Sequence, residues 1–434
     1  MKKIIFTTVL ATIAGAFVFA GGVENKTNLS TGYLRNPSRN VESERPEAAF
    51  YNIAGTAFME DGLYVEAGNQ FVIKEYSHEM NIPAAGIDMK STEDTPVLLY
   101  PNADIVYKQD KLSIFGNFGI YAGGGNLEYK NTPLIPGKMA AAAQNYATQA
   151  QNALAANNAA AAQQYQQAAQ QYQSMIASTK TNKLEVSSMT YGGQIGVGYA
   201  INDIVSLSAA FRTVYGDQTM KLSLASLSKE ISYDASAWGF GGVFGVHVKP
   251  IENLDLALQY QSLTKIEYEF ENVKGADFAS QAGLAIANGE KFNTDLPAVL
   301  NFGVGYRVID PLYLSASFNY YFNKQAEQNS ALGETDYDDS FEISVGADYR
   351  FNEKVSASLG LSYGNQGQND ESNSPLSPVL DSFTVGAGVE YSPTEALTLT
   401  GAGMYVEYFE EEYNSMDLNK DTMLFSLGVT YKFF

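Results

Sequence analysis

Hydrophobic and polar residues alternate with a period of two along most of this chain. Between residues 312 and 322, one set of alternate positions is apolar and comprises Leu312, Leu314, Ala316, Phe318, Tyr320 and Phe322. The positions between them include Ser315, Ser317 and Asn319, which are small and polar. A period of two places successive side chains on opposite faces of a β-sheet. The pattern predicts an all-β protein whose strands have one apolar face and one polar face.

Short turns rich in Asn, Asp, Glu and Pro separate many of these runs. Six such turns lie at residues 108–111, 200–203, 250–253, 308–311, 351–354 and 392–395. Seven longer excursions lie at about residues 77–95, 122–187, 218–235, 271–296, 323–339, 365–379 and 410–421. Together they delimit fourteen strands with short turns at one end and long loops at the other, as in bacterial outer-membrane barrels. We therefore predict a 14-stranded antiparallel transmembrane β-barrel with its apolar face toward lipid. A secreted β-protein, with that face buried against another sheet, is the alternative.

The chain begins with the features of a secretory signal peptide, in which Lys2 and Lys3 precede an apolar run that ends at Ala20. Residues 21–62 then show neither helical nor strand periodicity, and the first strand begins at Leu63. A segment of this length before the first strand of a large barrel suits a plug inside the lumen, and an ordinary lead-in loop is the alternative. We assign residues 1–20 to a signal peptide, 21–62 to an N-terminal hatch and 63–434 to the barrel.

Composition narrows the possible functions. The formal net charge of −21 disfavours binding to nucleic acid, whose phosphates would be repelled. The chain has no Cys and two His residues, His78 and His247, far apart in the sequence, so neither thiol chemistry nor a zinc site is expected. We expect no enzymatic activity and no cofactor. Trp238 is the single Trp beside 29 Tyr and 24 Phe, so aromatic belts at the membrane interfaces would consist of Tyr and Phe.

The sequence resembles the FadL family, the long-chain fatty-acid transporters of bacterial outer membranes. That family carries an Asn-Pro-Ala motif in its hatch, and residues 52–55 here read Asn-Ile-Ala-Gly, with Ile53 in place of the proline. The hairpins at residues 191–216, 238–268, 296–317 and 383–408 also look like successive wall hairpins of the family. The candidate hatch residues are Phe50, Asn52, Ala54 and Gly55.

The resemblance implies passive uptake of hydrophobic molecules, either fatty acids or aromatic hydrocarbons, across the outer membrane. In such a transporter, substrate is captured between extracellular loops, enters a lumenal pocket beside the hatch and leaves laterally through a gap in the wall. The implied partners are the hydrophobic ligand, the lipid of the outer membrane and lipopolysaccharide.

Two excursions contain more apolar residues than is usual for exposed loops, and exposed apolar surface often marks a binding site. The candidate capture residues are Leu222, Leu224, Leu227, Phe278, Leu284 and Ile286. The alternative is that these loops pack on each other as a lid over the barrel mouth. Alternation also places Arg212 and Lys265 on the lumen face, where a cation suits a ligand carboxylate. Pairing with a neighbouring acid, Glu267 or Glu269 for Lys265, is the alternative.

A lateral opening is expected between the second and third strands. Pairing these strands about a turn centred between Gln109 and Asp110 places Pro101 opposite Phe118 and Asn102 opposite Asn117. Pro cannot donate a hydrogen bond to the ladder, and Gly and Asn weaken a strand. The candidate gate residues are Pro101, Gly116, Asn117 and Gly119, and a closed barrel with a harmless bulge is the alternative.

Residues 138–179 contain no Gly, Pro or acidic residue and consist largely of Ala, Gln and Asn. Because Ala and Gln favour helix, we predict long helices, or a helical hairpin bent near Asn157 and Asn158, in an extracellular loop. Tyr165 and Tyr172 begin a narrow apolar seam that suits a second helix or a protein partner. A surface adhesin or receptor, with this loop as its working part and the barrel as its anchor, is therefore an alternative function. A general diffusion porin is another.

Overall fold

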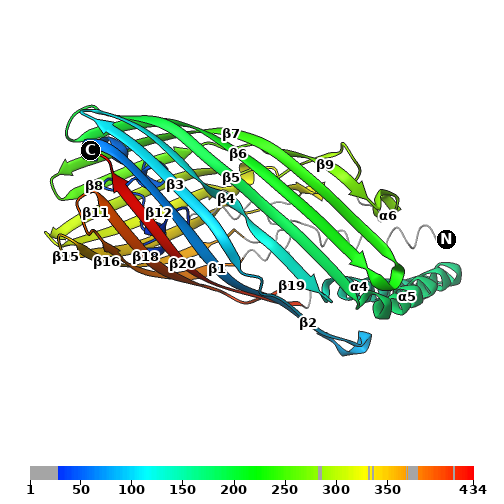
Figure 1. Cartoon of the computed structure of the whole chain (residues 1–434). Coiled ribbons are helices and arrows are strands. Elements are labelled where there is room, and N and C mark those ends of the chain that lie inside the picture. The colour runs from blue at the N-terminus through cyan, green and yellow to red at the C-terminus, as the bar shows by residue number, and fades with distance from the viewer. Residues whose placement is uncertain are drawn as a thin grey trace.

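The computed structural model describes residues 28–434 except 282–285, 331, 332, 335, 336, 368, 370–379, 414 and 415. Fourteen antiparallel strands close into a barrel, which confirms the predicted fold class (Figure 1). In chain order these strands are β1 (Gly62–Ile82), β2 with β3 (Ile87–Glu93, Val97–Gln109), β4 (Leu112–Lys130), β5 (Asn182–Ala200), β6 (Val205–Leu224), β7 (Lys229–Ile251), β8 with β9 (Leu254–Gln261, Glu267–Lys274), β10 with β11 (Lys291–Asn293, Ala298–Ile309), β12 (Leu312–Phe322), β15 (Ser340–Asn352), β16 (Val355–Asn365), β17 (Ser382–Tyr391), β18 (Leu397–Tyr408) and β20 (Met416–Lys432). The first strand pairs with the last from Tyr64↔Lys432 to Glu79↔Asp417, so the sheet closes on itself.

Smaller elements lie before the barrel and between its strands. They are α2 (Thr31–Arg35), α3 (Ala48–Tyr51), η1 (Gly55–Phe58), η2 (Pro83–Ala85), α4 (Leu134–Ala155), α5 (Ala159–Thr179), η3 (Ala225–Leu227), α6 (Ala276–Gln281), η4 (Asn323–Gln325), β13 (Asn329–Ser330), β14 (Gly333–Glu334) and β19 (Glu411–Tyr413). We call the end of the barrel with short connections the turn end, and the end with α4, α5 and α6 the loop end. The C-terminus lies at the turn end (Figure 1).

The two faces of the wall differ as the sequence pattern predicts. On β12 the outward Leu314 and Phe318 are exposed, whereas the inward Ser315 and Ser317 are buried. Exposed apolar side chains occur along most of the wall strands, which suits a surface in contact with lipid. Among the residues that the structure describes, no helix is both long and apolar enough to cross a membrane.

Toward the loop end, several strands extend far beyond the predicted length. In these extensions the inner face is apolar and the outer face is polar, which is the reverse of the arrangement in the rest of the wall. The predicted loop at residues 218–235 is mostly strand, because β6 and β7 pair as far as Leu224↔Lys229. Here Leu222 is buried on the inner face, while Lys221 is exposed on the outer face. The inversion has a physical reason: beyond the lipid the outer face meets water and the inner face packs against other parts of the protein.

The helices α4 and α5 form the predicted antiparallel hairpin at the loop end, with its bend at residues 156–158. Tyr146 of α4 stacks on Tyr165 and Tyr172 of α5, with ring centroids 6.2 and 5.4 Å apart. Tyr172 is fully buried, so the predicted apolar seam faces the other helix of the hairpin.

The strand made of β8 and β9 is interrupted at residues 262–266, and its alternation shifts there by one residue. Gln259 and Gln261 face the lumen before the interruption, whereas Ile266 and Tyr268 are buried on the inner face after it. Lys265 is consequently exposed on the outer face. The prediction that Lys265 lies in the lumen is therefore wrong, because strict alternation does not hold through a bulge.

Residues 28–61, which we call the N-terminal segment, lie inside the barrel toward the turn end (Figure 1). α2 packs against β16, β17, β18, β20 and β1, whereas α3 and η1 contact strands from β3 to β6. Nearly all of its residues from Leu29 to Ala57 are buried. The segment therefore touches the wall on several sides and occupies the lumen at this height.

Candidate transport pathway

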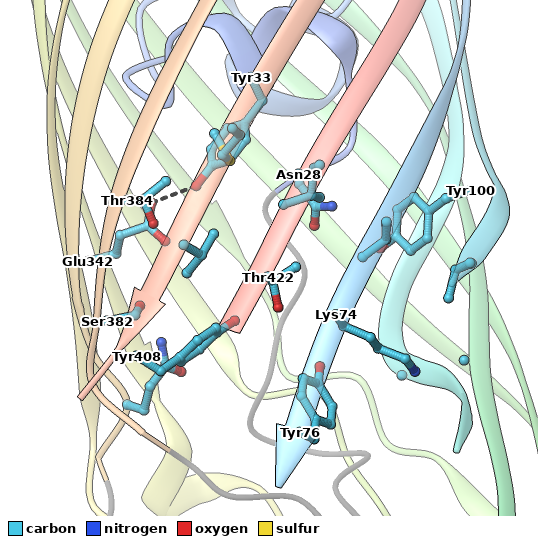
Figure 2. Close-up of a pocket in the computed structure, with 18 of the residues that line it drawn as sticks. Asn28, Tyr33, Lys74, Tyr76, Tyr100, Glu342, Ser382, Thr384, Tyr408 and Thr422 are labelled. Atoms are coloured by element: carbon cyan, nitrogen blue, oxygen red, sulfur yellow. Dashed lines mark hydrogen bonds between the residues drawn. The ribbon is translucent and has the colours of Figure 1, made fainter. Parts of the chain in front are cut away.

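A cavity of about 150 Å³ lies in the lumen between the N-terminal segment and the loop end. Tyr33 of α2 points into it from the segment, while Lys74 and Tyr76 of β1, Tyr100 of β3 and Tyr408 of β18 point in from the wall (Figure 2). An apolar cavity of about 150 Å³ in another protein binds benzene. We call this space the outer cavity, and it has room for a small hydrophobic molecule or for part of a longer one.

Two buried lysines lie among the aromatic rings at this height. Lys74 donates a hydrogen bond to the Asn126 carbonyl oxygen at 2.9 Å, and its Nζ lies 5.4 Å from the Tyr76 ring centre. The Nζ of Lys420 lies 4.3 Å from the ring centre of Tyr408 and 5.0 Å from that of Tyr76. Aromatic faces stabilise a cation electrostatically. The combination of rings and ammonium groups suits a hydrophobic molecule with an anionic end.

The wall beside the outer cavity is incomplete between β3 and β4. Their pairing runs only from Gln109↔Leu112 to Ala103↔Phe118, although β4 continues to Lys130. Beyond Phe118 the consecutive residues Ile120 to Ala122 are all buried, which shows that β4 bends into the lumen here. The Tyr100 hydroxyl donates a hydrogen bond to the Ile120 carbonyl oxygen at 3.0 Å across the interruption.

Two glycines shape this bend. Gly123 and Gly125 have positive φ of 100° and 75°, and the pairing of β4 with β5 shifts between Ile120 and Gly125. A Cβ at Gly123 would lie 2.3 Å from the Ser188 carbonyl oxygen, so no other residue fits this backbone position. Both glycines line the outer cavity, which therefore extends to the interruption in the wall. Sequence reasoning missed them because they fall in the predicted loop at residues 122–187.

The interruption lies between β3 and β4, the two strands in which the gate residues were predicted, but the predicted register is off by one residue. The hairpin has a two-residue turn at Asp110 and Lys111, and Asp110 has a φ of 53°. Asp tolerates positive φ, and this turn moves the centre of the hairpin by one residue. Gly116 and Asn117 therefore pair regularly with Ile105 and Asp104.

The other two predicted gate residues lie beyond the last rung. Pro101 lies on β3 where pairing with β4 has ended. A Cβ at Gly119 would lie 2.9 Å from the side chain of Leu29 in the N-terminal segment.

Of the predicted capture residues, the four whose side chains the structure describes are buried or partly buried. Leu222 and Leu224 lie in β6, each with 1% exposure, and belong to the same apolar cluster as Tyr172 of α5. Ile286 is buried in this cluster, and the partly buried Leu227 packs against it. This packing agrees with the alternative of a lid at the barrel mouth. The side chain of Phe278 and the whole of Leu284 lie outside the described residues.

The Asn-Ile-Ala-Gly motif fixes the N-terminal segment to the wall. Asn52 Nδ2 lies 2.9 Å from the Glu42 carbonyl oxygen and 2.7 Å from His247 Nδ1. The Ile53 amide donates to Gln259 Oε1 at 3.0 Å, and the Ala54 carbonyl oxygen accepts from Ser206 Oγ at 2.8 Å. A Cβ at Gly55 would lie 2.3 Å from the Glu42 carbonyl oxygen, which explains the glycine.

The remaining candidate hatch residue, Phe50, contacts the bent part of β4. Its ring meets that of Tyr121 edge to face at 5.4 Å, and its carbonyl oxygen accepts a hydrogen bond from Gln259 Nε2 at 3.0 Å. Phe50 therefore connects the N-terminal segment to the strand that bends beside the outer cavity.

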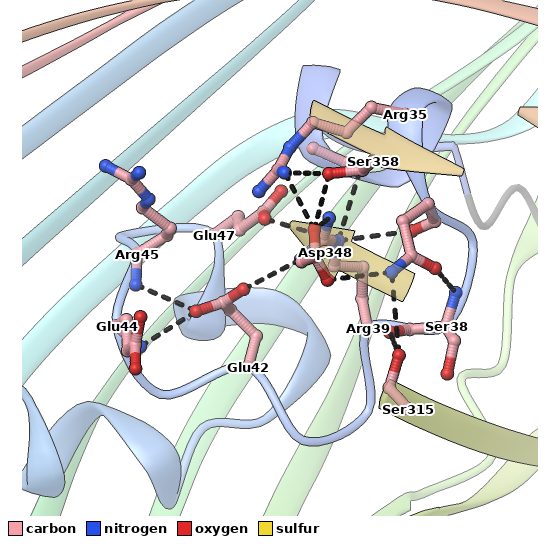
Figure 3. A network of polar contacts seen from close by, with 12 residues as sticks. Arg35, Ser38, Arg39, Glu42, Glu44, Arg45, Glu47, Ser315, Asp348 and Ser358 are labelled. Carbon is pink, nitrogen blue, oxygen red and sulfur yellow. Dashed lines mark hydrogen bonds and ion pairs between the residues drawn. The ribbon is translucent and has the colours of Figure 1, made fainter. Parts of the chain in front are cut away.

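Ion pairs anchor the same segment on the opposite side of the barrel (Figure 3). Arg35 of α2 pairs with Asp348 of β15 at 2.8 Å and with Glu390 of β17 at 3.3 Å. Arg39 lies 3.5 Å from Asp348, and Arg45 lies 2.7 Å from Glu390. The charge of Glu390 raises the pKa of Arg45, so this guanidinium stays protonated. Alternation along the wall gave no signal for these pairs, because their arginines lie in a segment without a period.

Arg212 faces the lumen, as its position in the alternation predicts, and is 2% exposed. Its guanidinium donates to Gln261 Oε1 at 2.7 Å, the Ser262 carbonyl oxygen at 2.7 Å and Thr264 Oγ1 at 2.6 Å. All three acceptors belong to the wall. The alternative of pairing with an acid does not hold within the described residues, where no carboxylate lies within ion-pair distance of Arg212.

A closed barrel with a lipid-facing apolar surface, a filled lumen and a lumenal cavity that reaches a break in the wall defines an outer-membrane channel for hydrophobic compounds. The family model described as outer membrane protein transport protein (OMPP1/FadL/TodX) matches residues 67–433. The chain belongs to this family, whose members are transport channels and not enzymes. A search of the curated proteins found no match.

Solved structures with the same fold cover nearly the whole chain. A FadL homologue of Pseudomonas aeruginosa aligns with a TM-score of 0.66 and 14% identity, over 96% of this chain and 100% of the homologue. The toluene transporter TodX of Pseudomonas putida aligns with a TM-score of 0.60 and 15% identity, over 95% and 98% of the two chains. The toluene transporter TbuX of Ralstonia pickettii aligns with a TM-score of 0.58 and 13% identity, over 92% and 98%.

Proposed function

We propose that this protein takes up hydrophobic molecules with an anionic end, such as long-chain fatty acids, and releases them laterally between β3 and β4. The observation that carries the proposal is the outer cavity, which is lined by aromatic rings and a buried lysine and extends to the interruption in the wall. Lys74 lies at this cavity and would hold the carboxylate. The relatives TodX and TbuX are toluene transporters. Small aromatic hydrocarbons such as toluene are therefore the second candidate ligands, since the cavity volume suits them.

The lateral route is supported by what fills the lumen. The N-terminal segment occupies the bore and is fixed to the wall by buried ion pairs and by the motif at residues 52–55. Passage straight through the bore would have to separate these ion pairs and leave their charges without partners, so it would require a costly displacement of the segment. The interruption between β3 and β4 offers an exit that leaves these contacts in place. The same filling argues against a general diffusion porin.

The replacement of Gly125 by Val tests the lateral route. A Cβ at Gly125 would lie 3.1 Å from Val97 Cγ2, so the larger side chain narrows the cavity where it meets the interruption. We expect a large loss of oleate uptake by cells that depend on this protein. Gly86→Val is the matched control, because Gly86 also has positive φ, at 64°, but has open space around it. Equal uptake by the two variants would contradict the lateral route.

Removing the charge of Lys74 should distinguish uptake of fatty acids from uptake of aromatic hydrocarbons. Lys74→Met keeps much of the side-chain volume but removes the ammonium group, so oleate uptake should fall while toluene uptake remains. Loss of neither substrate would mean that Lys74 does not bind the carboxylate, and comparable loss of both would indicate damage to the cavity itself.

A further inference from the structure

A second interruption in the wall lies between β7 and the strand formed by β8 and β9. Regular pairing with β7 ends at Val243↔Gln261 and resumes at Ser236↔Glu269. In the described part of the chain, one backbone hydrogen bond connects residues 237–242 with residues 262–266, from the Ser262 amide to the Gly242 carbonyl oxygen at 2.9 Å. Regular backbone pairing is therefore nearly absent here, as it is between β3 and β4.

Residues 262–266, which we call the inner flap, lie against the lumen side of β7. A Cβ at Gly239 would lie 2.8 Å from the Lys265 carbonyl oxygen, and one at Gly241 would lie 2.7 Å from Thr264 Oγ1. The neighbouring Trp238 and Phe240 point outward and are 61% and 59% exposed. The inner flap thus rests on bare glycine backbone, while large aromatic side chains mark the same place on the lipid side.

Arg212 holds the inner flap from inside the barrel. It lies on β6 opposite Gly241 of β7, and its Nε would be 3.4 Å from a Cβ at that glycine. The side chain therefore passes over β7 to reach the flap, where it donates to the Ser262 carbonyl oxygen and to Thr264 Oγ1. A charged donor makes stronger hydrogen bonds than a neutral one, especially where water is excluded. On the β7 side, the bonds from Arg212 add to the one from the Gly242 amide to Ser262 Oγ at 2.9 Å, while the bridge between Thr264 and Leu296 joins the flap to the strand on its other side.

A second, smaller cavity lies in the lumen beside Arg212. It measures about 30 Å³ and is lined by Arg212, Gln261 and Leu296 of the wall and by Tyr33 of the N-terminal segment. Tyr33 also lines the outer cavity, so the two spaces share this residue.

We propose that this interruption is a second lateral port, which Arg212 holds closed, and through which hydrophobic molecules pass between the lumen and the lipid when the inner flap is released. The identity of the molecules that pass through the port rests on the proposed transport function. The closure of the port by hydrogen bonds from Arg212 to the flap, which we call the latch, does not rest on it. Trp238 and Phe240 form the lipid-side contact surface of the port.

A reversible disulfide between β7 and the inner flap, which we call a clamp, tests the port. The chain has no native cysteine, so Gly241→Cys with Ser262→Cys introduces a single possible disulfide. A Cβ at Gly241 would lie 3.1 Å from Ser262 Oγ, which is close enough for a disulfide between the two positions. If the two ports act in parallel with equal flux, oxidation lowers the initial rate of oleate uptake to about half, and a reductant restores it. Gly401→Cys with Leu427→Cys, on directly opposite lipid-facing positions of β18 and β20, is the control clamp and should leave the rate unchanged.

Cysteine labelling tests the latch without any transport. Thr264→Cys places a thiol on the inner flap, and a lipid-soluble maleimide should label it several-fold faster when Arg212 is also replaced by Met. Because Thr264 accepts one of the Arg212 bonds, Leu263→Cys serves as a second reporter that leaves all three acceptors in place. Unchanged labelling at both reporters would overturn the proposal, as would uptake by the G241C/S262C protein that is the same when oxidised and reduced. If no form of the protein transports oleate, the proposed function fails and labelling alone decides whether the latch exists.

Discussion

At the scale of single residues, the N-terminal segment shows how one departure from a family motif is compensated. Ile53 occupies the position where the FadL family has proline, and its amide donates to Gln259 Oε1. Proline lacks this donor, so the bond to Gln259 on β8 requires a residue other than proline at position 53. The motif itself was visible in the sequence. Its partners on the wall were not, because they lie about two hundred residues away along the chain.

Ile53→Pro is therefore expected to destabilise the segment, although it restores the family motif. The substitution leaves the buried Gln259 Oε1 without its donor, which costs about 1–3 kcal/mol. Protease accessibility of the segment in the folded barrel measures this, with Ile53→Val as a control that keeps the amide. A proline variant as resistant as the parent protein would show that the bond to Gln259 contributes nothing.

At the scale of elements, the strands were predictable where lipid touches them and unpredictable beyond it. Alternation located every strand of the wall, since the outer face must be apolar in the membrane. Near the loop end the apolar positions of the alternation face inward, so Leu222 and Leu224 belong to a strand and pack inside the barrel, not in the predicted loop. Lys265 was misplaced for a related reason, because a bulge changes the phase of a strand without leaving a clear mark in the sequence.

An aromatic seam joins the two helices of the α4–α5 hairpin. Tyr172 is fully buried against Tyr146, and replacing a buried aromatic residue by Ala costs about 3–5 kcal/mol. We expect Tyr172→Ala to expose the hairpin to limited proteolysis while the barrel stays intact. Tyr165→Ala is the control, because Tyr165 is only partly buried. Cleavage that is equally slow in both variants would mean that contacts with the barrel, and not the seam, hold the helices.

At the scale of the whole molecule, three parts of the fold have different roles. The strands provide the lipid-facing cylinder, the N-terminal segment fills the bore, and the outer cavity lies where β4 bends away from β3. A polar cavity of about 380 Å³ on the turn side of the segment is lined by the arginines and carboxylates that anchor it. Its charged lining is unsuited to a hydrophobic molecule, so the two sides of the segment differ in chemistry.

Because the two cavities differ in this way, locating a bound ligand tests whether it leaves the lumen laterally from the outer cavity. A crystal structure with a brominated long-chain fatty acid would place the bromine by its anomalous signal. We expect a peak in the outer cavity, near Tyr33 and Lys74, or in the interruption between β3 and β4 beside Gly125. A peak in the charged cavity on the turn side of the N-terminal segment would contradict it, because the ligand would then have passed along the bore.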